Sequence, residues 1–240
     1  MFTICLYAIG ILLHSNSYSI ASTTRIPNLI EQAVSSQAFE DSVAASQTSF
    51  IPFQPMIFEC SRSYHLPPSL VAAVIQEESR FDPWAERAEP RYALRRAVKR
   101  NAIDWLRSHS GGPSLSTELN ARSRSMGLMQ VMGEVAREQG FDAPFLSALF
   151  APENSLHQGC KLLRRLLDRY PHDTLAAISA YNQGSARRSK LRADHRGDHN
   201  FLNARYVYRV MIAWRAYREA FALVNAETHE SVNHAGGSHE

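Results

Sequence analysis

The stretch 71–83 limits the fold more than any other part of the chain, because its apolar residues recur at helical spacing. This spacing predicts an amphipathic helix that ends before the proline closing the stretch. At roughly 100° per residue, Val71, Val74 and Ile75 share one face of the helix. Glu78 falls at the centre of that face, so the helix places one carboxyl group among its apolar residues.

The side chain of Glu78 is open to two interpretations. A carboxylate on an apolar helix face is costly unless it is paired, or unless its pKa rises and it stays protonated. One interpretation is a structural carboxylate, satisfied by an Arg or by backbone donors. The other is a general acid, because such a group must hold a proton near neutral pH. The neighbouring Glu77 points well to the side of the helix.

The composition fits one helical domain. The chain has 240 residues, of which 45% are hydrophobic and 20% charged, enough to bury one good core. Val and Ile mostly lie inside helical patterns, and the alternating runs typical of strands are hard to find. We therefore predict an all-α fold, with the compact domain at 51–224.

The first fifty residues are expected to lie outside this domain. Residues 1–21 hold an apolar run, 4–13, and then the small-x-small site Ser19-Ile20-Ala21, which is typical of an export signal. No Lys or Arg precedes the run, so an uncleaved anchor or a buried terminal helix is the alternative. Residues 22–50 are rich in Ser, Thr and Ala and predict a linker. We expect export to the periplasm or cell envelope.

The cysteines leave one pairing to consider. Cys5 lies in the expected signal, so Cys60 and Cys160 are the two that remain in the exported chain. In an oxidising compartment they can form a disulfide. They can equally be free, buried thiols on helix faces, and the sequence leaves both alternatives open.

Residues 84–124, about forty in number, are interpreted as an insertion. They include a basic helical part at 92–108 and the loop Gly111-Gly112-Pro113. A basic helix face is usually just solvated. The functional alternative is a wall or lid that contacts an anionic polymer.

The apolar run 125–132 contains one glycine and one glutamine. Gly127 permits the close approach of another chain segment or a ligand. Gln130 must find a hydrogen-bond partner, and a sugar hydroxyl or acetamide would serve. The methionines of the run fit a core as well as a site.

The rest of the chain predicts helices and two polar regions. The expected helices are 151–170, 174–182 and 201–224, and a disordered tail is expected at 225–240. His195 and His199 are four residues apart but have no third ligand pattern, so no metal is expected. The basic clusters lack interleaved aromatics and the net charge is only +3, which argues against a nucleic-acid partner.

Four short motifs follow one another along the chain: Glu78-Ser79, Gly127-Leu128-Met129-Gln130, Ala180-Tyr181-Asn182 and Tyr206-Val207. Their order, with Asn154-Ser155 before a Gly159-centred helix, resembles the soluble lytic transglycosylases of bacterial cell-wall metabolism, over roughly 66–217. The resemblance implies a lysozyme-like α-helical catalytic domain, called the SLT domain. It also implies that the partner is the glycan strands of peptidoglycan and that no cofactor is used.

The same resemblance implies a role for each matched residue. Glu78 would be the only acid/base group. It would protonate the oxygen between N-acetylmuramic acid and N-acetylglucosamine, and then accept the proton of the muramyl 6-hydroxyl to give a 1,6-anhydro product. The residues that would bind the sugar or line the site are Ser79, Met129, Gln130, Tyr181, Asn182 and Tyr206.

Two features depart from the family pattern. The 84–124 connection is longer than usual and resembles versions linked to phages and mobile elements, and Gly133 stands where the pattern has Pro.

Two other functions are considered. A goose-type muramidase would need a second carboxylate, for which Asp82 is nearest in sequence. A non-catalytic wall-binding module would serve a secretion, conjugation or phage assembly. We expect the protein to be a monomer.

Overall fold

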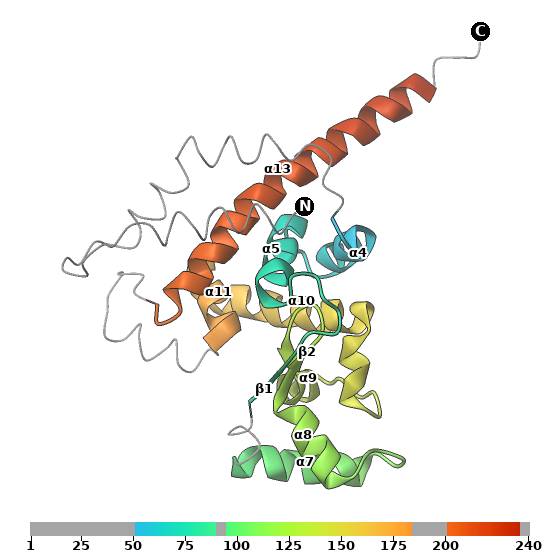
Figure 1. The fold of residues 1–240 in the computed structure, drawn as a ribbon, viewed down its shortest axis with the longest axis vertical. Helices are drawn as coiled ribbons and strands as arrows, with labels where there is room; N and C mark the ends of the chain where they lie inside the picture. Colours follow the sequence, from blue (N-terminus) through green and yellow to red (C-terminus); the bar gives the residue numbers. More distant parts are fainter. Residues whose placement is uncertain (1–50, 90–94, 184–200, 236–240) are drawn as a thin grey trace, which may run out of the picture. The chain divides into compact units, whose positions relative to one another are not determined.

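The computed structural model describes residues 51–89, 95–183 and 201–235, with side chains up to residue 222. Helices dominate, which confirms the predicted helical class (Figure 1). The elements are α4 (Gln54–Ser63), α5 (Pro68–Glu78), β1 (Glu86–Ala88), α7 (Arg96–Ser108), α8 (Leu115–Arg122), β2 (Arg124–Met126), β3 (Val131–Met132), α9 (Gly133–Glu138), the 3-10 helix η1 (Leu146–Phe150), α10 (Pro152–Arg169), α11 (Thr174–Gln183) and α13 (Ala204–Ala235).

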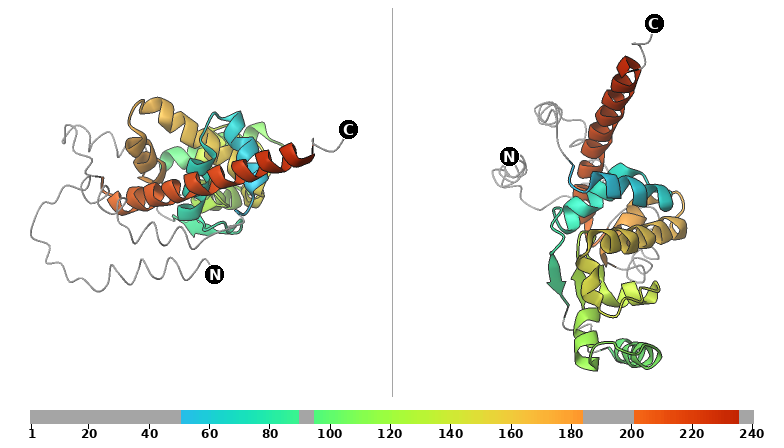
Figure 2. Two further views of the ribbon diagram at one scale, coloured as in Figure 1. Left: turned by 90° about the horizontal axis from the view of Figure 1, so that it is seen from above. Right: turned by 90° about the vertical axis from the view of Figure 1, so that its right-hand side faces the viewer.

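Helix α5 lies at the centre of the core. Its residues from Leu70 to Ile75 are at most 1% exposed, as expected for a helix that is apolar on nearly all sides. α13 packs along α5, and α4 packs against α5 and α10 (Figures 1 and 2). The helix that the spacing of Val71 and Val74 predicts is therefore present, but it is buried on nearly all sides and not on one face as predicted. It starts with Pro68 in its first turn, where a missing N–H costs little.

A small antiparallel sheet, ordered β1-β2-β3, adds to the predicted all-α fold. Glu86 pairs with Met126, and Met126 pairs with Val131 on its other side. The strands have two or three residues each, too few to show an alternating pattern in the sequence.

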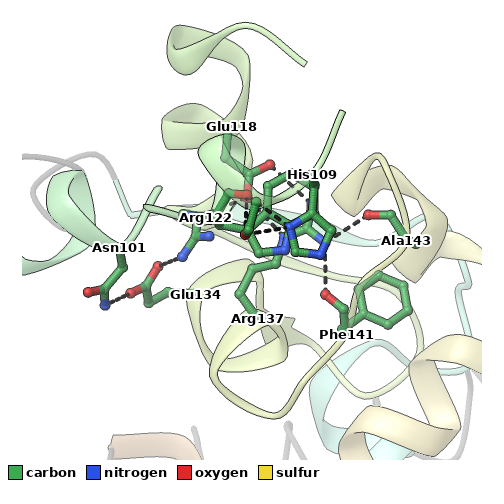
Figure 3. Close-up of polar contacts among 10 residues, drawn as sticks. Asn101, His109, Glu118, Arg122, Glu134, Arg137, Phe141 and Ala143 are labelled. Carbon is green, nitrogen blue, oxygen red and sulfur yellow. Dashed lines mark hydrogen bonds and ion pairs between the residues drawn. The ribbon is translucent and has the colours of Figure 1, made fainter. Parts of the chain in front are cut away.

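The 84–124 segment leaves the body through β1, contains α7 and α8, and returns through β2. Four charged side chains attach it to α9, and we call them the ion cluster: Glu118, Arg122, Glu134 and Arg137 (Figure 3). Each of these side chains is at most 2% exposed. Arg122 joins the two acids, with its Nε 2.9 Å from Glu118 Oε1 and its Nη1 2.6 Å from Glu134 Oε2.

Helix α7 covers the ion cluster. Asn101 Nδ2 donates to Glu134 Oε1 at 2.8 Å, and the guanidinium of Arg137 lies 3.6 Å from the centre of the Trp105 ring. Arg137 also donates to the backbone carbonyls of Phe141 and Ala143 (Figure 3). The segment is therefore fastened to the domain through buried polar contacts. Its basic side chains, Arg96, Lys99, Arg100 and Arg107, are exposed.

The C-terminal helix is longer than the sequence predicts. α13 runs to Ala235, eleven residues beyond the expected end at 224, through part of the region predicted as a disordered tail. This stretch contains no Gly or Pro until Gly236, so nothing in it interrupts a helix. No helix among the described residues is long and apolar enough to cross a membrane.

The structure tests the prediction for the cysteines and leaves three other predictions untested. Cys60 and Cys160 are free thiols, on the neighbouring helices α4 and α10. A hydrogen bond with Cys60, together with burial, raises the pKa of the Cys160 thiol well above its usual value. The expected signal, 1–21, the expected linker, 22–50, and the pair His195 and His199 lie outside the described residues.

Candidate active site

Glu78 is the last residue of α5 and meets α13 and α11 there. The helix ends because Ser79 leaves helical geometry, and Arg80 and Phe81 follow with left-handed φ values of 55° and 63°. Tyr206, in the first turn of α13, donates its hydroxyl to Glu78 Oε1 at 2.7 Å. Two predicted site residues 128 positions apart are thus in direct contact.

The carboxyl group of Glu78 has an unusual proton affinity. Burial raises its pKa from 4.5 to about 7, against the opposing effects of the Tyr206 hydrogen bond and the charge of Arg87. The nearby Glu77 raises the pKa further, and a hydrogen bond from Asn182 lowers it. A small part of the side chain still reaches the surface. The group can therefore both hold and release a proton near neutral pH.

Helix α13 contacts three successive polar residues of α5. Besides Tyr206 at Glu78, Arg209 Nε lies 2.5 Å from Glu77 Oε2, and the Tyr217 hydroxyl donates to Gln76 Oε1 at 3.2 Å. Glu77 is turned toward Arg209, so it contacts the same helix as Glu78. These contacts fix the end of α5, and hence Glu78, against α13.

Asn203 is a site residue that the sequence analysis missed. Its Nδ2 donates to Asn182 Oδ1 at 3.1 Å and to the backbone carbonyl of Ser179, and its Oδ1 accepts from the Ser179 hydroxyl at 2.8 Å. Because the Oδ1 of Asn182 is engaged, its amide nitrogen is the group that hydrogen-bonds Glu78. An Asn just before a helix is a common cap residue, and this position is the sequence feature that could have indicated Asn203.

Gln130 closes the turn between β2 and β3. Its Nε2 donates to the carbonyls of Ala85 at 2.7 Å and Gly127 at 3.0 Å. Since both donors are used within the protein, a sugar would have to donate to its Oε1. Gly127 has φ 77°, and a Cβ there would lie 2.2 Å from the Leu149 carbonyl oxygen. The predicted close approach at Gly127 is therefore that of another chain segment.

Met129 and Tyr181 support this turn from inside. Met129 is fully buried. It packs so closely against Gly159 that a Cβ added at Gly159 would lie 2.3 Å from the Met129 sulfur. The Tyr181 hydroxyl donates to the Met129 carbonyl at 2.8 Å, and the Met129 N–H donates to Ser155 Oγ at 3.0 Å. The structure thus gives Met129 no exposed surface, and its position supports the Gln130 turn.

Ser79 lies next to Glu78 but is nearly buried. Its Oγ donates to the Ile75 carbonyl at 3.3 Å, within the last turn of α5. The predicted site residues therefore fall into two kinds. Glu78, Asn182 and Gln130 are partly exposed, whereas Ser79, Tyr181 and Tyr206 are at most 9% exposed.

Two other features of the described residues bear on the chemistry. No three His, Cys, Asp or Glu side chains among them form a group that could hold a metal ion. A cavity of about 380 Å³ is lined by residues such as Pro67, Leu70 and Trp214, at the N-terminal end of α5. Glu78 is at the other end of this helix, so its assignment rests on its chemistry and contacts.

Comparison with known proteins identifies related folds and a family. One similar structure is the lytic transglycosylase Slt of Pseudomonas aeruginosa, in an inactive mutant form, with 18% identity, a TM-score of 0.50 and coverage of 77% of this chain and 28% of that one. The 70 kDa soluble lytic transglycosylase Slt70 of Escherichia coli has 18% identity, a TM-score of 0.51 and coverage of 85% and 31%. The chain thus spans less than a third of either protein.

A search of curated protein sequences finds no significant match. The family model described as the Transglycosylase SLT domain matches residues 55–202, more than half of the chain. This match covers Glu78, Gln130 and Asn182. The chain therefore belongs to the Transglycosylase SLT domain family.

Proposed function

We propose that this protein is a peptidoglycan lytic transglycosylase with Glu78 as its single acid/base group. The observation that carries the proposal is a carboxyl group with a pKa of about 7, held by Tyr206 and Asn182 in a chain of the SLT family. The substrate would be the β-1,4 bond between N-acetylmuramic acid and N-acetylglucosamine. Because peptidoglycan lies outside the cytoplasm, the proposal includes export to the periplasm or cell envelope.

In the first half of the reaction, protonated Glu78 donates its proton to the glycosidic oxygen as the bond to C1 of the muramyl sugar breaks. The freed N-acetylglucosamine keeps that proton as a hydroxyl hydrogen. Glu78 becomes a carboxylate, and the hydrogen bonds from Tyr206 and Asn182 stabilise its charge. Asn203 holds the Asn182 amide in the orientation that this requires.

In the second half, the Glu78 carboxylate accepts the proton of the muramyl 6-hydroxyl while that oxygen bonds to C1. The product is a 1,6-anhydro sugar, Glu78 is protonated again, and no water is consumed. A pKa near the working pH suits one group that must act first as acid and then as base. This scheme needs one carboxyl group where ordinary glycosidases use two.

The remaining predicted residues have supporting roles in this proposal. Gln130 would accept a hydrogen bond from the sugar through its Oε1, because its amide protons are bound to Ala85 and Gly127. Met129 and Tyr181 would hold the Gln130 turn in place from below. Ser79 would fix the end of α5 and present its remaining lone pairs beside Glu78.

A hydrolytic reaction of the goose-lysozyme kind would need a second carboxylate to activate water. Asp82, the nearest in sequence, accepts the backbone N–H of Trp84 through its Oδ1 at 2.9 Å. Glu77 is engaged by Arg209. One oxygen of each carboxylate is thus engaged within the protein, and the released products distinguish hydrolysis from the non-hydrolytic scheme.

The test is mass spectrometry of the soluble products that the purified full chain releases from peptidoglycan. We expect 1,6-anhydromuropeptides, and their loss by at least about a thousandfold in Glu78→Gln. The similar Pseudomonas aeruginosa structure is of an inactive mutant with a glutamate changed to glutamine, which supports the choice of substitution. Glu77→Gln is the matched control, because it makes the same change one residue away and should keep the products.

The outcomes separate the alternatives. Products with free reducing ends would show hydrolysis and overturn the proposal. A Glu78→Gln variant that releases as much product as the parent would overturn the role of Glu78. If neither protein releases any product although both are folded, the non-catalytic wall-binding alternative is favoured.

A further inference from the structure

Trp84 is the most exposed large apolar side chain of the described residues, at 73%. The other two tryptophans, Trp105 and Trp214, are partly buried and have partners in the core or the ion cluster. Exposing a whole indole ring to water is unfavourable. An exposed Trp on a well-fixed segment is therefore a candidate contact for a ligand.

The backbone around Trp84 is fixed to the candidate active site. Its N–H donates to Asp82 Oδ1 at 2.9 Å. The carbonyl of the next residue, Ala85, accepts from Gln130 Nε2 at 2.7 Å and from the Gly127 N–H at 3.0 Å. The residue after Trp84 is therefore hydrogen-bonded to the turn that holds Gln130, and Trp84 itself is six residues after Glu78.

The ring itself has a supporting partner. Its centre lies 5.6 Å from that of Phe150, with the planes inclined at 33°. Phe150 ends η1, whose Leu149 is fully buried and has its carbonyl against Gly127. The backbone next to each ring thus meets the same turn, through the Ala85 carbonyl on one side and the Leu149 carbonyl on the other. We call Trp84 and Phe150 the aromatic pair.

We propose that the aromatic pair is a sugar-binding subsite, in which the exposed face of Trp84 stacks on a pyranose ring of the glycan strand. This inference rests on the proposed function for its ligand class. A β-1,4-linked pyranose has an apolar face of C–H groups and a rim of hydroxyl and acetamide groups. An aromatic ring fixed beside polar side chains suits both parts.

The surroundings of the pair favour a sugar over a protein or lipid partner. Exposed charged residues lie close to Trp84 in the chain, including Asp82, Glu86 and Arg87. Glu86 pairs with Arg124 at 2.9 Å, and Arg87 with Glu89 at 3.4 Å. Two rings within such a polar rim are far smaller than the roughly 1,000 Å² that a stable protein interface needs. A single sugar ring matches the size of the pair.

The experiment measures binding without turnover, in the full chain carrying Glu78→Gln. The probe is the β-1,4-linked hexasaccharide of N-acetylglucosamine, titrated by calorimetry. Adding Trp84→Ala should weaken binding about tenfold, and Trp84→Phe should retain most of it, because a smaller ring still stacks. In the Glu78→Gln parent the ligand should also shift the tryptophan emission, and this shift should be lost in Trp84→Phe.

The control is Phe145→Ala, which removes another exposed ring, 50% exposed, at the start of η1. Phe145→Ala should bind the hexasaccharide as tightly as the Glu78→Gln parent. All variants should keep the melting temperature of that parent, because Trp84 and Phe145 are both exposed. The subsite is overturned if Trp84→Ala binds as tightly as the parent, if Phe145→Ala loses as much, or if the parent does not bind the hexasaccharide.

These results are separable from the proposed function. If the unsubstituted chain releases no anhydro product but the hexasaccharide still depends on Trp84, the transglycosylase proposal fails and the subsite stands. If the products form and Trp84→Ala changes neither binding nor their release, the subsite fails and the transglycosylase stands.

Discussion

Glu78 and the ion cluster show two ways in which one protein holds buried acids. In the ion cluster, Glu118 and Glu134 are bound by the guanidinium groups of Arg122 and Arg137. Glu78 is held by neutral donors, the Tyr206 hydroxyl and the Asn182 amide. Charged partners favour an ion pair, whereas neutral donors offset only part of the cost of burying a carboxylate.

The difference matches the positions of the two regions. The ion cluster joins the 84–124 segment to α9, where acids that stay ion-paired give a fixed attachment. Glu78 ends α5 and is partly exposed, where a pKa of about 7 allows a proton to be exchanged. The kind of partner, and not burial alone, separates a structural acid from a candidate catalytic one.

The largest expected effect is on the ion cluster. Arg122→Met removes the cation between Glu118 and Glu134 and leaves two buried carboxylates short of a partner. The free energy of unfolding should fall by about 3–5 kcal/mol, measured by chemical denaturation. The folded fraction should keep the proposed peptidoglycan-cleaving activity, because Arg122 has no contact with Glu78.

The control for this change is Arg107→Met in the same segment. Its partner is Asp104 at 3.5 Å, and both side chains are mostly exposed, so the change should stay within about 0.5 kcal/mol. A loss below about 1 kcal/mol for Arg122→Met would mean that the cluster does not stabilise the fold as an ion-paired unit.

At alkaline pH, Glu78→Gln should increase the free energy of unfolding, which is the opposite of the effect of Arg122→Met. The folded protein binds the Glu78 proton more tightly than the unfolded chain, with a pKa of about 7 against 4.5. The stability of the parent should therefore fall as the pH rises through this window and level off above it. At pH 8 the variant should be more stable than the parent by up to about 3 kcal/mol, and near pH 4 the two should agree.

Thermal or denaturant unfolding of both proteins from pH 4 to pH 8 measures this difference. Glu59→Gln, a change of the same kind at an exposed site on α4, should show no comparable trend. A difference between Glu78→Gln and the parent that stays constant across the range would show that the pKa of Glu78 is not raised on folding.

The sequence predicts the acid more fully than its partners. The helical spacing of Val71 and Val74 predicts the helix that ends at Glu78, and the structure contains this helix, because its period is fixed by helix geometry. The predicted single apolar face is not found, since α5 is buried on nearly all sides from Leu70 to Ile75. Tyr206 and Asn182 could be named only through the family resemblance, since no local pattern links residues so far apart. Asn203 was missed because an isolated Asn before a helix predicts a cap and not a site.

The ion cluster shows why other features escaped prediction. Glu118 and Arg122 have the i, i+4 spacing of an ordinary exposed helix pair. Their burial depends on Glu134 and Arg137 from another helix, and the sequence does not show that the two helices meet. The sheet was missed for a different reason, because β3 has only two residues.

A smaller effect is expected for Tyr206→Phe, on the pH dependence of activity. The Tyr206 hydrogen bond stabilises the ionised form of Glu78 and lowers its pKa, so its removal should raise that pKa. The alkaline limb of the rate of fragment release should move to higher pH, with a loss of about fivefold to tenfold at the optimum. An alkaline limb that does not move, or that moves to lower pH, would contradict the assigned hydrogen bond.

The smallest effect on the pH dependence of activity should come from Glu77→Gln, and its direction should be opposite to that of Tyr206→Phe. The negative charge of Glu77 raises the pKa of Glu78, and it ranks below burial, the Tyr206 bond and Arg87 in size. Removing that charge should lower the pKa, so the alkaline limb should move to lower pH, less far than Tyr206→Phe moves it upward. Activity at the optimum should stay within about twofold, because the pair that Glu77 forms with Arg209 is partly exposed.

Arg209→Met is the matched partner of this change. It leaves the charge of Glu77 without its counter-ion, so Glu77 should repel the Glu78 carboxylate more strongly. The pKa of Glu78 should then rise, and the alkaline limb should move to higher pH. The two substitutions thus remove opposite members of one ion pair and should move the limb in opposite directions. If both move it the same way, the changes act through the packing of α5 on α13, and a neighbouring charge does not tune the proton of Glu78.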